Sequence, residues 1–181
     1  MPRIPVHTVE DAPAEAREGL RSLAQKMGKV LNIHGEMAHA PVVLAAYQGI
    51  QKAIEEHGTF DARTREAIAL AVGAANDCAY CQSAHTAAGR AAGWSEQETV
   101  RIRSGRVDFD PDLDALLSVA REITSQRGEV EERTWKSARE AGWSETQLTE
   151  LFTHVALNLY TNYFNHYAQT ELDVPKAPGL D

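Results

Sequence analysis

The sequence predicts an all-α protein with two related helical halves. Apolar residues recur at three- and four-residue spacing along most of the 181 residues, which is the period of an amphipathic helix. No segment of useful length alternates between apolar and polar residues as a strand does. Residues that favour helix starts precede the periodic segments, and glycines often follow them.

Start and stop signals divide the chain into a series of helices. Pro13 opens the first helix, which ends near Gly28. Pro41 opens the next, and Gly58 terminates it. Residues 29–40 lie between these helices and show a mixed pattern. We expect further helices at residues 62–75, 78–92, 95–103, 111–127, 130–141 and 144–172.

The helix predicted at 62–75 has a candidate N-cap in Asp61. After Glu66 it contains almost only Ala, Ile, Leu and Val, so we expect it to be buried on most sides. Asn76 and Asp77 break this helix and can cap the next one.

The pentapeptide AGWSE occurs at residues 92–96 and again at 141–145, 49 positions later. In each copy the serine stands three residues before Glu98 or Gln147, which is the spacing of a capping box. Chance reuse of a good helix connector would explain the repeat. We favour a duplicated helical hairpin, because the helices on both sides of each copy also correspond.

The length suits one domain. We expect a first helical half at residues 13–103, which contains both cysteines, and a second at 111–172, which contains none. Residues 104–110 form the linker between them. The tail at 173–181 is expected to lie loosely on the surface.

The most informative stretch contains a glutamate, two cysteines and a histidine. Cys78 and Cys81 are the only cysteines, and they lie in the apolar neighbourhood of Glu66 and His85. On a helix each residue turns about 100°, so Cys81 and His85 would lie about 60° and about 20° from Cys78. One face would then carry a nucleophile, a resolving thiol and a base.

The spacing E-x11-C-x2-C-x3-H of Glu66, Cys78, Cys81 and His85 resembles the alkylhydroperoxidase D and carboxymuconolactone decarboxylase superfamily. The resemblance implies an alkylhydroperoxidase D-like helical fold and a thiol-dependent hydroperoxide reductase. It also implies a homo-oligomer, commonly a trimer or a hexamer. Some relatives have a histidine before the second cysteine, where this chain has Tyr80.

The resemblance also implies a role for each of these residues. Cys81 would attack the hydroperoxide, Cys78 would close the disulfide, and Glu66 with His85 would relay the proton. The oxidised pair would need a dithiol reductant, such as a lipoyl protein or a thioredoxin-like protein. No bound cofactor and no metal are required.

Two local effects can activate a thiol in this stretch. The positive potential of a helix N-terminus acts near Cys78, and His85 lies one turn from Cys81, where it can accept a proton. If Glu66 is buried its pKa should rise, which suits a base working near neutrality. Alternatively, Glu66 is only a first-turn residue that the helix dipole favours.

Other functions compete with peroxide reduction. Cys78, Cys81 and His85 are suitable zinc ligands, but zinc usually has a fourth ligand, and the sequence has no second cysteine pair. The decarboxylase branch of the superfamily acts on a lactone acid without a cysteine pair. A third alternative is a redox sensor whose disulfide changes packing without peroxide turnover.

The overall composition excludes several classes of protein. The net charge of −8 argues against nucleic-acid binding, since a basic surface is the usual footprint. No apolar run approaches the length of a membrane-spanning helix. The N-terminus lacks the apolar segment of a signal peptide. We therefore expect a cytoplasmic protein that does not bind membranes.

Two further sets of polar residues lie outside the four-residue motif. His34 and His39 flank the junction before Pro41 and are expected to be surface or capping residues. A polar stripe recurs every four residues in the last helix. It is either solvated, or it forms a buried line that faces a subunit interface or the active cleft. The residues of this stripe are Glu150, His154, Asn158, Asn162 and His166.

Overall fold

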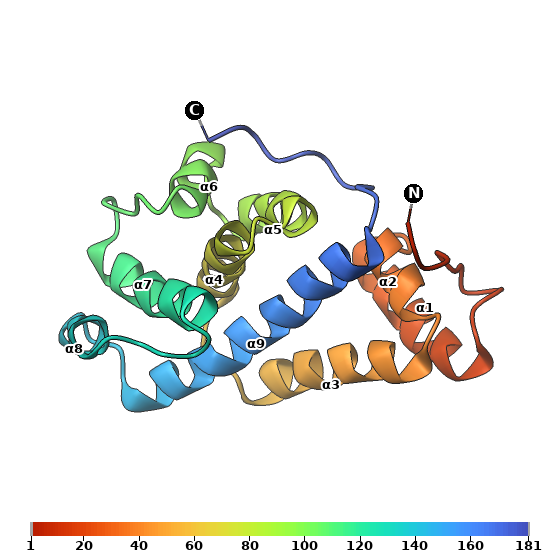
Figure 1. Ribbon diagram of the computed structural model, residues 1–181, viewed down its shortest axis with the longest axis horizontal. Helices are drawn as coiled ribbons and strands as arrows, with labels where there is room; N and C mark the ends of the chain where they lie inside the picture. The colour runs from red at the N-terminus through yellow and green to blue at the C-terminus, as the bar shows by residue number, and fades with distance from the viewer. Residues whose placement is uncertain (1, 181) are drawn as a thin grey trace.

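The protein is described here by a computed structural model, which covers residues 2–180. All regular secondary structure in that range is helical, so the all-α prediction is confirmed (Figure 1). The helices are α1 (Ala14–Met27), α2 (Asn32–Met37), α3 (Pro41–His57), α4 (Ala62–Ala75), α5 (Ala79–Ala91), α6 (Glu96–Arg103), α7 (Pro111–Ser125), α8 (Glu132–Glu140) and α9 (Glu145–Ala168).

The long helix α9 crosses the molecule between α3 and the α4–α5 pair, and it packs against all three (Figure 1). Two apolar clusters lie around it. One contains residues of α4, α6, α7, α8 and α9, with Leu70, Leu116 and Leu151 fully buried. The other contains residues of α1, α2, α3 and α5, and both cysteines belong to it. α4 is buried along most of its length, as predicted.

The predicted helix caps form as expected. The Asp61 side chain accepts a hydrogen bond from the backbone N–H of Thr64 and so caps α4. Ser95 and Ser144 each form a complete capping box at the start of α6 and α9. Local sequence therefore sets these helix starts, because short polar side chains satisfy N–H groups that have no partner within the helix.

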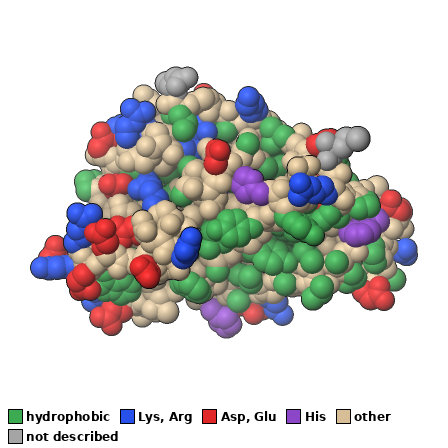
Figure 2. Space-filling view, viewed as in Figure 1, with side chains coloured by type: hydrophobic (Ala, Val, Ile, Leu, Met, Phe, Trp, Pro, Cys, Tyr) green, Lys and Arg blue, Asp and Glu red, His purple; other side chains and the backbone are tan. Residues whose placement is uncertain are grey.

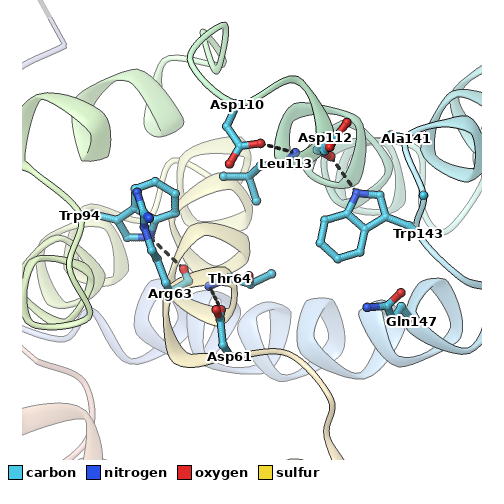
Figure 3. A pocket seen from close by; sticks show the side chains of 11 residues that line it. Asp61, Arg63, Thr64, Trp94, Asp110, Asp112, Leu113, Ala141, Trp143 and Gln147 are labelled. Atoms are coloured by element: carbon cyan, nitrogen blue, oxygen red, sulfur yellow. Dashed lines mark hydrogen bonds between the residues drawn. The ribbon is translucent and has the colours of Figure 1, made fainter.

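The two copies of the pentapeptide occupy equivalent places in the structure. The Trp94 indole N–H donates to the Arg63 carbonyl at 2.8 Å, and the Trp143 indole N–H donates to the Asp112 carbonyl at 2.7 Å (Figure 3). The two donors lie 49 positions apart in the sequence, and so do the two acceptors. This shared contact supports a duplication that relates α4–α6 to α7–α9. The division into halves stays a prediction.

The segment at 29–40, whose pattern was mixed, contains the short helix α2. Ile33 and Met37 are buried on it, and so is His34, with only 4% of its surface exposed. The prediction that His34 is a surface or capping residue is therefore wrong, whereas His39 is exposed. Packing against α1 and α3 buries α2, and contacts of this kind leave no periodic signal in six residues.

The C-terminal segment differs from its prediction in two ways. α9 ends at Ala168, before the predicted position, because Gln169 adopts a left-handed backbone conformation with φ 56°. The tail is also held in place. The Ala177 N–H donates to the Ser83 hydroxyl at 3.1 Å, and Arg103 donates to the Pro178 carbonyl at 2.7 Å. The expectation of a loose tail was wrong.

The surface is uneven in its distribution of apolar groups. Figure 2 shows apolar side chains gathered over the face formed by α3 and α9, whereas charged side chains gather over the side of α6–α8. Large exposed apolar residues of α3 and α9 are Val42, Phe152, Tyr163 and Tyr167. Within residues 2–180, no helix is both long and apolar enough to cross a membrane.

Candidate active site

The α4–α5 hairpin brings the glutamate and the histidine of the motif together. Asp77 turns the chain with a positive φ of 51°, and the Cys78 N–H bonds back to the Gly73 carbonyl at 2.9 Å. α5 then runs back along α4. The His85 Nδ1 atom lies 2.8 Å from a Glu66 carboxylate oxygen. The spacing in the sequence thus becomes a carboxylate–imidazole pair.

Glu66 and His85 are partly accessible, with 24% and 29% of their side chains exposed. Burial by itself would lower the pKa of His85. The charge of Glu66 and its hydrogen bond outweigh that effect, so the pKa of His85 is raised. The pair therefore suits a group that takes up a proton near neutral pH.

The two cysteines lie at the start of α5, and both are buried and reduced. Cys78 is the N-cap residue, so its backbone is not helical as the one-face geometry assumed. Its sulfur accepts the backbone N–H of Cys81 at 3.3 Å. Asn165 of α9 reaches both thiols. Its side-chain N–H group lies 3.2 Å from the Cys81 sulfur and 3.9 Å from the Cys78 sulfur.

The pKa values of the two cysteine thiols are shifted in opposite directions. The Cys81 side chain and its backbone N–H lower the pKa of Cys78 to about 7, although burial opposes the shift. The neighbouring Cys78 side chain and burial raise the pKa of Cys81. Ionisation is therefore easier at Cys78 than at Cys81. The expected effect of the helix N-terminus appears at Cys78.

A cavity of about 250 Å³ connects these groups. Cys81, Glu66 and His85 all line it, whereas Cys78 does not. Most of the remaining residues that line this cavity are apolar, and they come from the N-terminal part of the chain and from α5. Among them are Leu23, Met27, Leu31, Ile33, Ala84 and Ala88.

A second cavity of about 280 Å³ adjoins the same ion pair, since Glu66 and His85 line both spaces. Its other walls include His154 and Asn158 of α9. Cys81 does not line this second space. The ion pair thus lies between a chamber that contains the thiol and a chamber that does not.

The polar stripe of α9 is mostly buried. His154, Asn158 and Asn162 are 3%, 7% and 0% exposed, so the solvated alternative is wrong for them. Asn162 accepts a hydrogen bond from the Asn76 side chain at 2.8 Å. His166, at the exposed end of the stripe, donates to the Asn76 carbonyl at 3.0 Å. The stripe therefore holds the turn that precedes the cysteines.

Asn165 was missed by the sequence analysis. The signal that would have found it is the spacing of Asn158, Asn162 and Asn165, which places three amides on one helical face at i, i+4 and i+7. A face that is otherwise flanked by apolar residues is buried, and buried amides need partners. For Asn165 those partners are the cysteine sulfurs.

Tyr80, which stands where some relatives have a histidine, has a structural contact instead. Its hydroxyl donates to an Asp173 carboxylate oxygen at 2.7 Å. The other oxygen of Asp173 accepts the Asn32 backbone N–H at 3.2 Å. Tyr80 therefore joins the tail and the start of α2 to the cysteine helix.

Burial of His34 gives the protein a predictable acid sensitivity. Burial lowers its pKa from 6.5 to about 4, which the charge of Asp173 opposes only in part. Below pH 6.5 the unfolded chain binds this proton and the folded chain does not, so stability falls with pH down to about 4. At pH 5 this residue should cost about 2 kcal/mol relative to pH 8.

Urea unfolding at both pH values tests this expectation. His34→Gln should reduce the loss of stability between pH 8 and pH 5 by about 2 kcal/mol. His57 is the control, because its side chain is 80% exposed, and His57→Gln should leave the loss unchanged. An equal pH dependence in wild type and His34→Gln would contradict the assignment.

A larger open cleft of about 390 Å³ lies elsewhere, between Trp94 and Trp143 (Figure 3). Its polar side chains already serve as caps and supports. Asp61 and Asp110 each accept a backbone N–H at a helix start. No cysteine or histidine lines this cleft, so we place the candidate chemistry in the smaller cavity. Among residues 2–180, no group of three or more His, Cys, Asp or Glu side chains could hold a metal ion.

Comparisons with known proteins find a matching family model and solved structures of similar fold. The model of the carboxymuconolactone decarboxylase family matches residues 41–122, which include all four residues of the motif. No curated protein matches the sequence.

Solved structures share the fold over nearly the whole chain. A peroxidase-related protein from Ralstonia eutropha JMP134, described as an alkylhydroperoxidase AhpD core, is 24% identical with a TM-score of 0.85. The match covers 97% of this chain and 98% of that one. A peroxidase-related protein from Silicibacter sp. TM1040 is 21% identical with a TM-score of 0.80, covering 99% and 94%.

A third structure shows that the fold also occurs in a different enzyme. The debrominase Bmp8, as a cysteine-to-alanine variant in complex with 2,3,4-tribromopyrrole, is 18% identical with a TM-score of 0.80. The match covers 94% of this chain and 91% of that one. Over residues 41–122 the chain is thus similar to the carboxymuconolactone decarboxylase family, and over nearly its whole length it shares the helical fold of the alkylhydroperoxidase AhpD core.

Proposed function

We propose that the protein is a thiol-dependent hydroperoxide reductase. One observation carries this proposal: Cys81 shares a cavity with the Glu66–His85 pair, and Cys78 lies next to it outside that cavity. A substrate in the cavity meets one thiol and one proton acceptor. The other thiol is held nearby by Asn165.

The reaction takes place in two steps. Cys81 transfers its proton to the Glu66–His85 pair and attacks the terminal oxygen of the hydroperoxide. An S–O bond forms, the O–O bond breaks, and the alcohol leaves after taking up the proton. The Cys78 thiolate then attacks the sulfur of the Cys81 sulfenic acid, so that the S–S bond forms and the S–O bond breaks, and the hydroxide that leaves takes up a proton from solvent to become water.

The opposite pKa shifts of Cys78 and Cys81 fit this sequence of steps. A thiolate on Cys78 is ready to resolve the sulfenic acid, whereas Cys81 needs a base before it can attack. The relay supplies that base. An external dithiol, such as a lipoyl protein or a thioredoxin-like protein, must then reduce the disulfide.

The lining of the cavity favours an organic hydroperoxide over hydrogen peroxide. Leu23, Leu31 and Ile33 provide an apolar wall, and Met27 lies on the same wall with half of its surface exposed. Burying apolar substrate atoms there contributes binding energy of roughly 25 cal/mol per Å². The apolar face of α3 and α9 supports assembly into a homo-oligomer, which we also propose.

A peroxidase assay tests the function. We expect turnover of cumene and tert-butyl hydroperoxide with dihydrolipoamide or thioredoxin as reductant, and slower turnover of hydrogen peroxide. Mass spectrometry after a single treatment should show the loss of two hydrogens at Cys78 and Cys81, which dithiol restores. 2,3,4-Tribromopyrrole serves as a comparison substrate, because the Bmp8 variant binds it.

The outcomes separate the competing functions. A reversible disulfide without turnover of any hydroperoxide would contradict the reductase and support a redox sensor. Independent and irreversible oxidation of each thiol would contradict a cooperating pair. Decarboxylation of a lactone acid that persists in a variant lacking both cysteines would support the decarboxylase branch instead.

A further inference from the structure

His34 is a polar group of the thiol cavity that the relay does not use. It lies on α2 and lines the same space as Cys81, Glu66 and His85. The side chain is 4% exposed. Its ring packs against that of Tyr47, with centroids 5.4 Å apart and planes inclined by 35°. Two elements from different parts of the chain therefore hold one imidazole at the wall of the cavity.

One ring nitrogen of His34 is enclosed without a hydrogen-bond partner in the described part of the chain. This atom, Nδ1, is buried and has no partner among residues 2–180. Buried polar atoms are normally paired, so an unpaired one needs a specific explanation. Because Nδ1 is enclosed by protein, the ring can reach a ligand in the cavity only through Nε2.

The environment also determines which hydrogen the ring carries. Burial lowers the pKa of His34 to about 4, so the imidazole is neutral at physiological pH and has a single N–H. Buried N–H groups without a partner are rarer than buried acceptors without one. The enclosed Nδ1 is therefore the unprotonated nitrogen, and Nε2 carries the hydrogen.

We propose that the Nε2–H group of His34 donates a hydrogen bond to the oxygen of the hydroperoxide that leaves when Cys81 attacks. This inference rests on the proposed function. As the S–O bond forms and the O–O bond breaks, the electron pair moves to the leaving oxygen. His34 stabilises this developing charge and keeps its own hydrogen. The proton that completes the alcohol comes from the Cys81 thiol through the Glu66–His85 pair.

Two amide variants and one apolar variant test the assignment. The side-chain N–H group of glutamine can occupy the place of Nε2, whereas that of asparagine reaches only the place of Nδ1. We expect His34→Gln to retain most of the rate of sulfenic acid formation at Cys81. His34→Asn and His34→Leu should lose about 100-fold, as is typical when a donor to a developing oxyanion is removed.

The leaving group supplies a readout that a purely structural role would not change. A peracid releases a stable carboxylate and needs little help, whereas an alkyl hydroperoxide releases a basic alkoxide. His34→Leu should therefore slow the reaction with tert-butyl hydroperoxide much more than the reaction with peracetic acid. The rate of Cys81 alkylation by iodoacetamide should stay within about twofold of wild type. If His34→Leu does not fold, the comparison of Gln with Asn decides the question.

The results distinguish the two proposals. A wild-type protein that reacts with no hydroperoxide overturns the reductase and this inference with it. An active wild type in which His34→Asn retains the full rate overturns the role of His34 alone. An equal loss for the alkyl hydroperoxide and the peracid also overturns it, because a hydrogen bond to the leaving oxygen must depend on that oxygen.

Discussion

Cys81→Ser is expected to abolish hydroperoxide consumption, whereas Cys78→Ser should permit a single turnover. The reason is access, because Cys81 lines the cavity and Cys78 does not. Without Cys78 there is no thiol to resolve the product, so the sulfenic acid should accumulate at Cys81. Trapping with a sulfenic-acid reagent, followed by mass spectrometry of the labelled peptide, measures this.

The two variants serve as controls for each other, since each removes one of the two sulfurs at the start of α5. The lowered pKa of Cys78 makes the opposite assignment a real alternative, because that thiol ionises first. A label at Cys78 in the Cys81→Ser variant would reverse the roles. Such a result would show that thiolate population, and not position in the cavity, decides which sulfur attacks.

Glu66→Gln should reduce the peroxidase rate at least about tenfold without loss of fold or disulfide capacity. A general base typically contributes about 100- to 10,000-fold, and Gln retains the shape of Glu without its basicity. The charge of Glu66 raises the pKa of His85, so its removal makes the imidazole a weaker proton acceptor. The apparent pKa of the Cys81 thiol should rise when its proton acceptor is weakened, so the rate should need a higher pH, which stopped-flow measurements across the pH range would show.

His85→Gln should behave like Glu66→Gln, and the double variant should be little slower than either, since groups that act as one unit are not additive. Glu150 offers a matched control. It pairs with His154 at 3.0 Å but does not line the thiol cavity. Its carboxylate accepts hydrogen bonds from the Thr59 backbone and hydroxyl groups. Glu150→Gln should lower stability and leave the peroxidase rate unchanged.

Full activity in Glu66→Gln with an unchanged pH profile would show that the glutamate has no part in proton transfer. The pair would then only stabilise the α4–α5 hairpin. Equal rate losses in Glu66→Gln and Glu150→Gln would instead indicate a general effect of lost carboxylates on the fold.

Much of the fold was predictable because its signals are local. Asp61, Ser95 and Ser144 start their helices as expected, and α4 has the predicted bounds. Capping depends on a side chain and an N–H group three residues away, so neither needs the rest of the protein. By contrast, the six residues of α2 give no clear periodicity, and that helix forms through packing against α1 and α3.

The four-residue motif also supplied most of the residues of the candidate active site. The family resemblance implied that Glu66 and His85 act together, which requires the helices on either side of Asn76 and Asp77 to pack antiparallel, and the two side chains meet at 2.8 Å. This part was predictable because a short turn between two helices leaves only a few registers. The difference between the pKa values of the two thiols was not predictable, since the Cys78 sulfur accepts the backbone N–H of Cys81 only because Cys78 is the N-cap residue.

The sequence by itself determined the helical class, the helix caps, the cysteine pair and the carboxylate–imidazole relay that we propose. Only the tertiary structure decided which thiol faces the cavity and which residues from distant segments surround it. Asn165 reaches the sulfurs from 84 positions away along the chain, and His34 enters the cavity wall from α2. Contacts at such separations follow from how helices pack around a shared core, and that packing leaves no fixed spacing in the sequence.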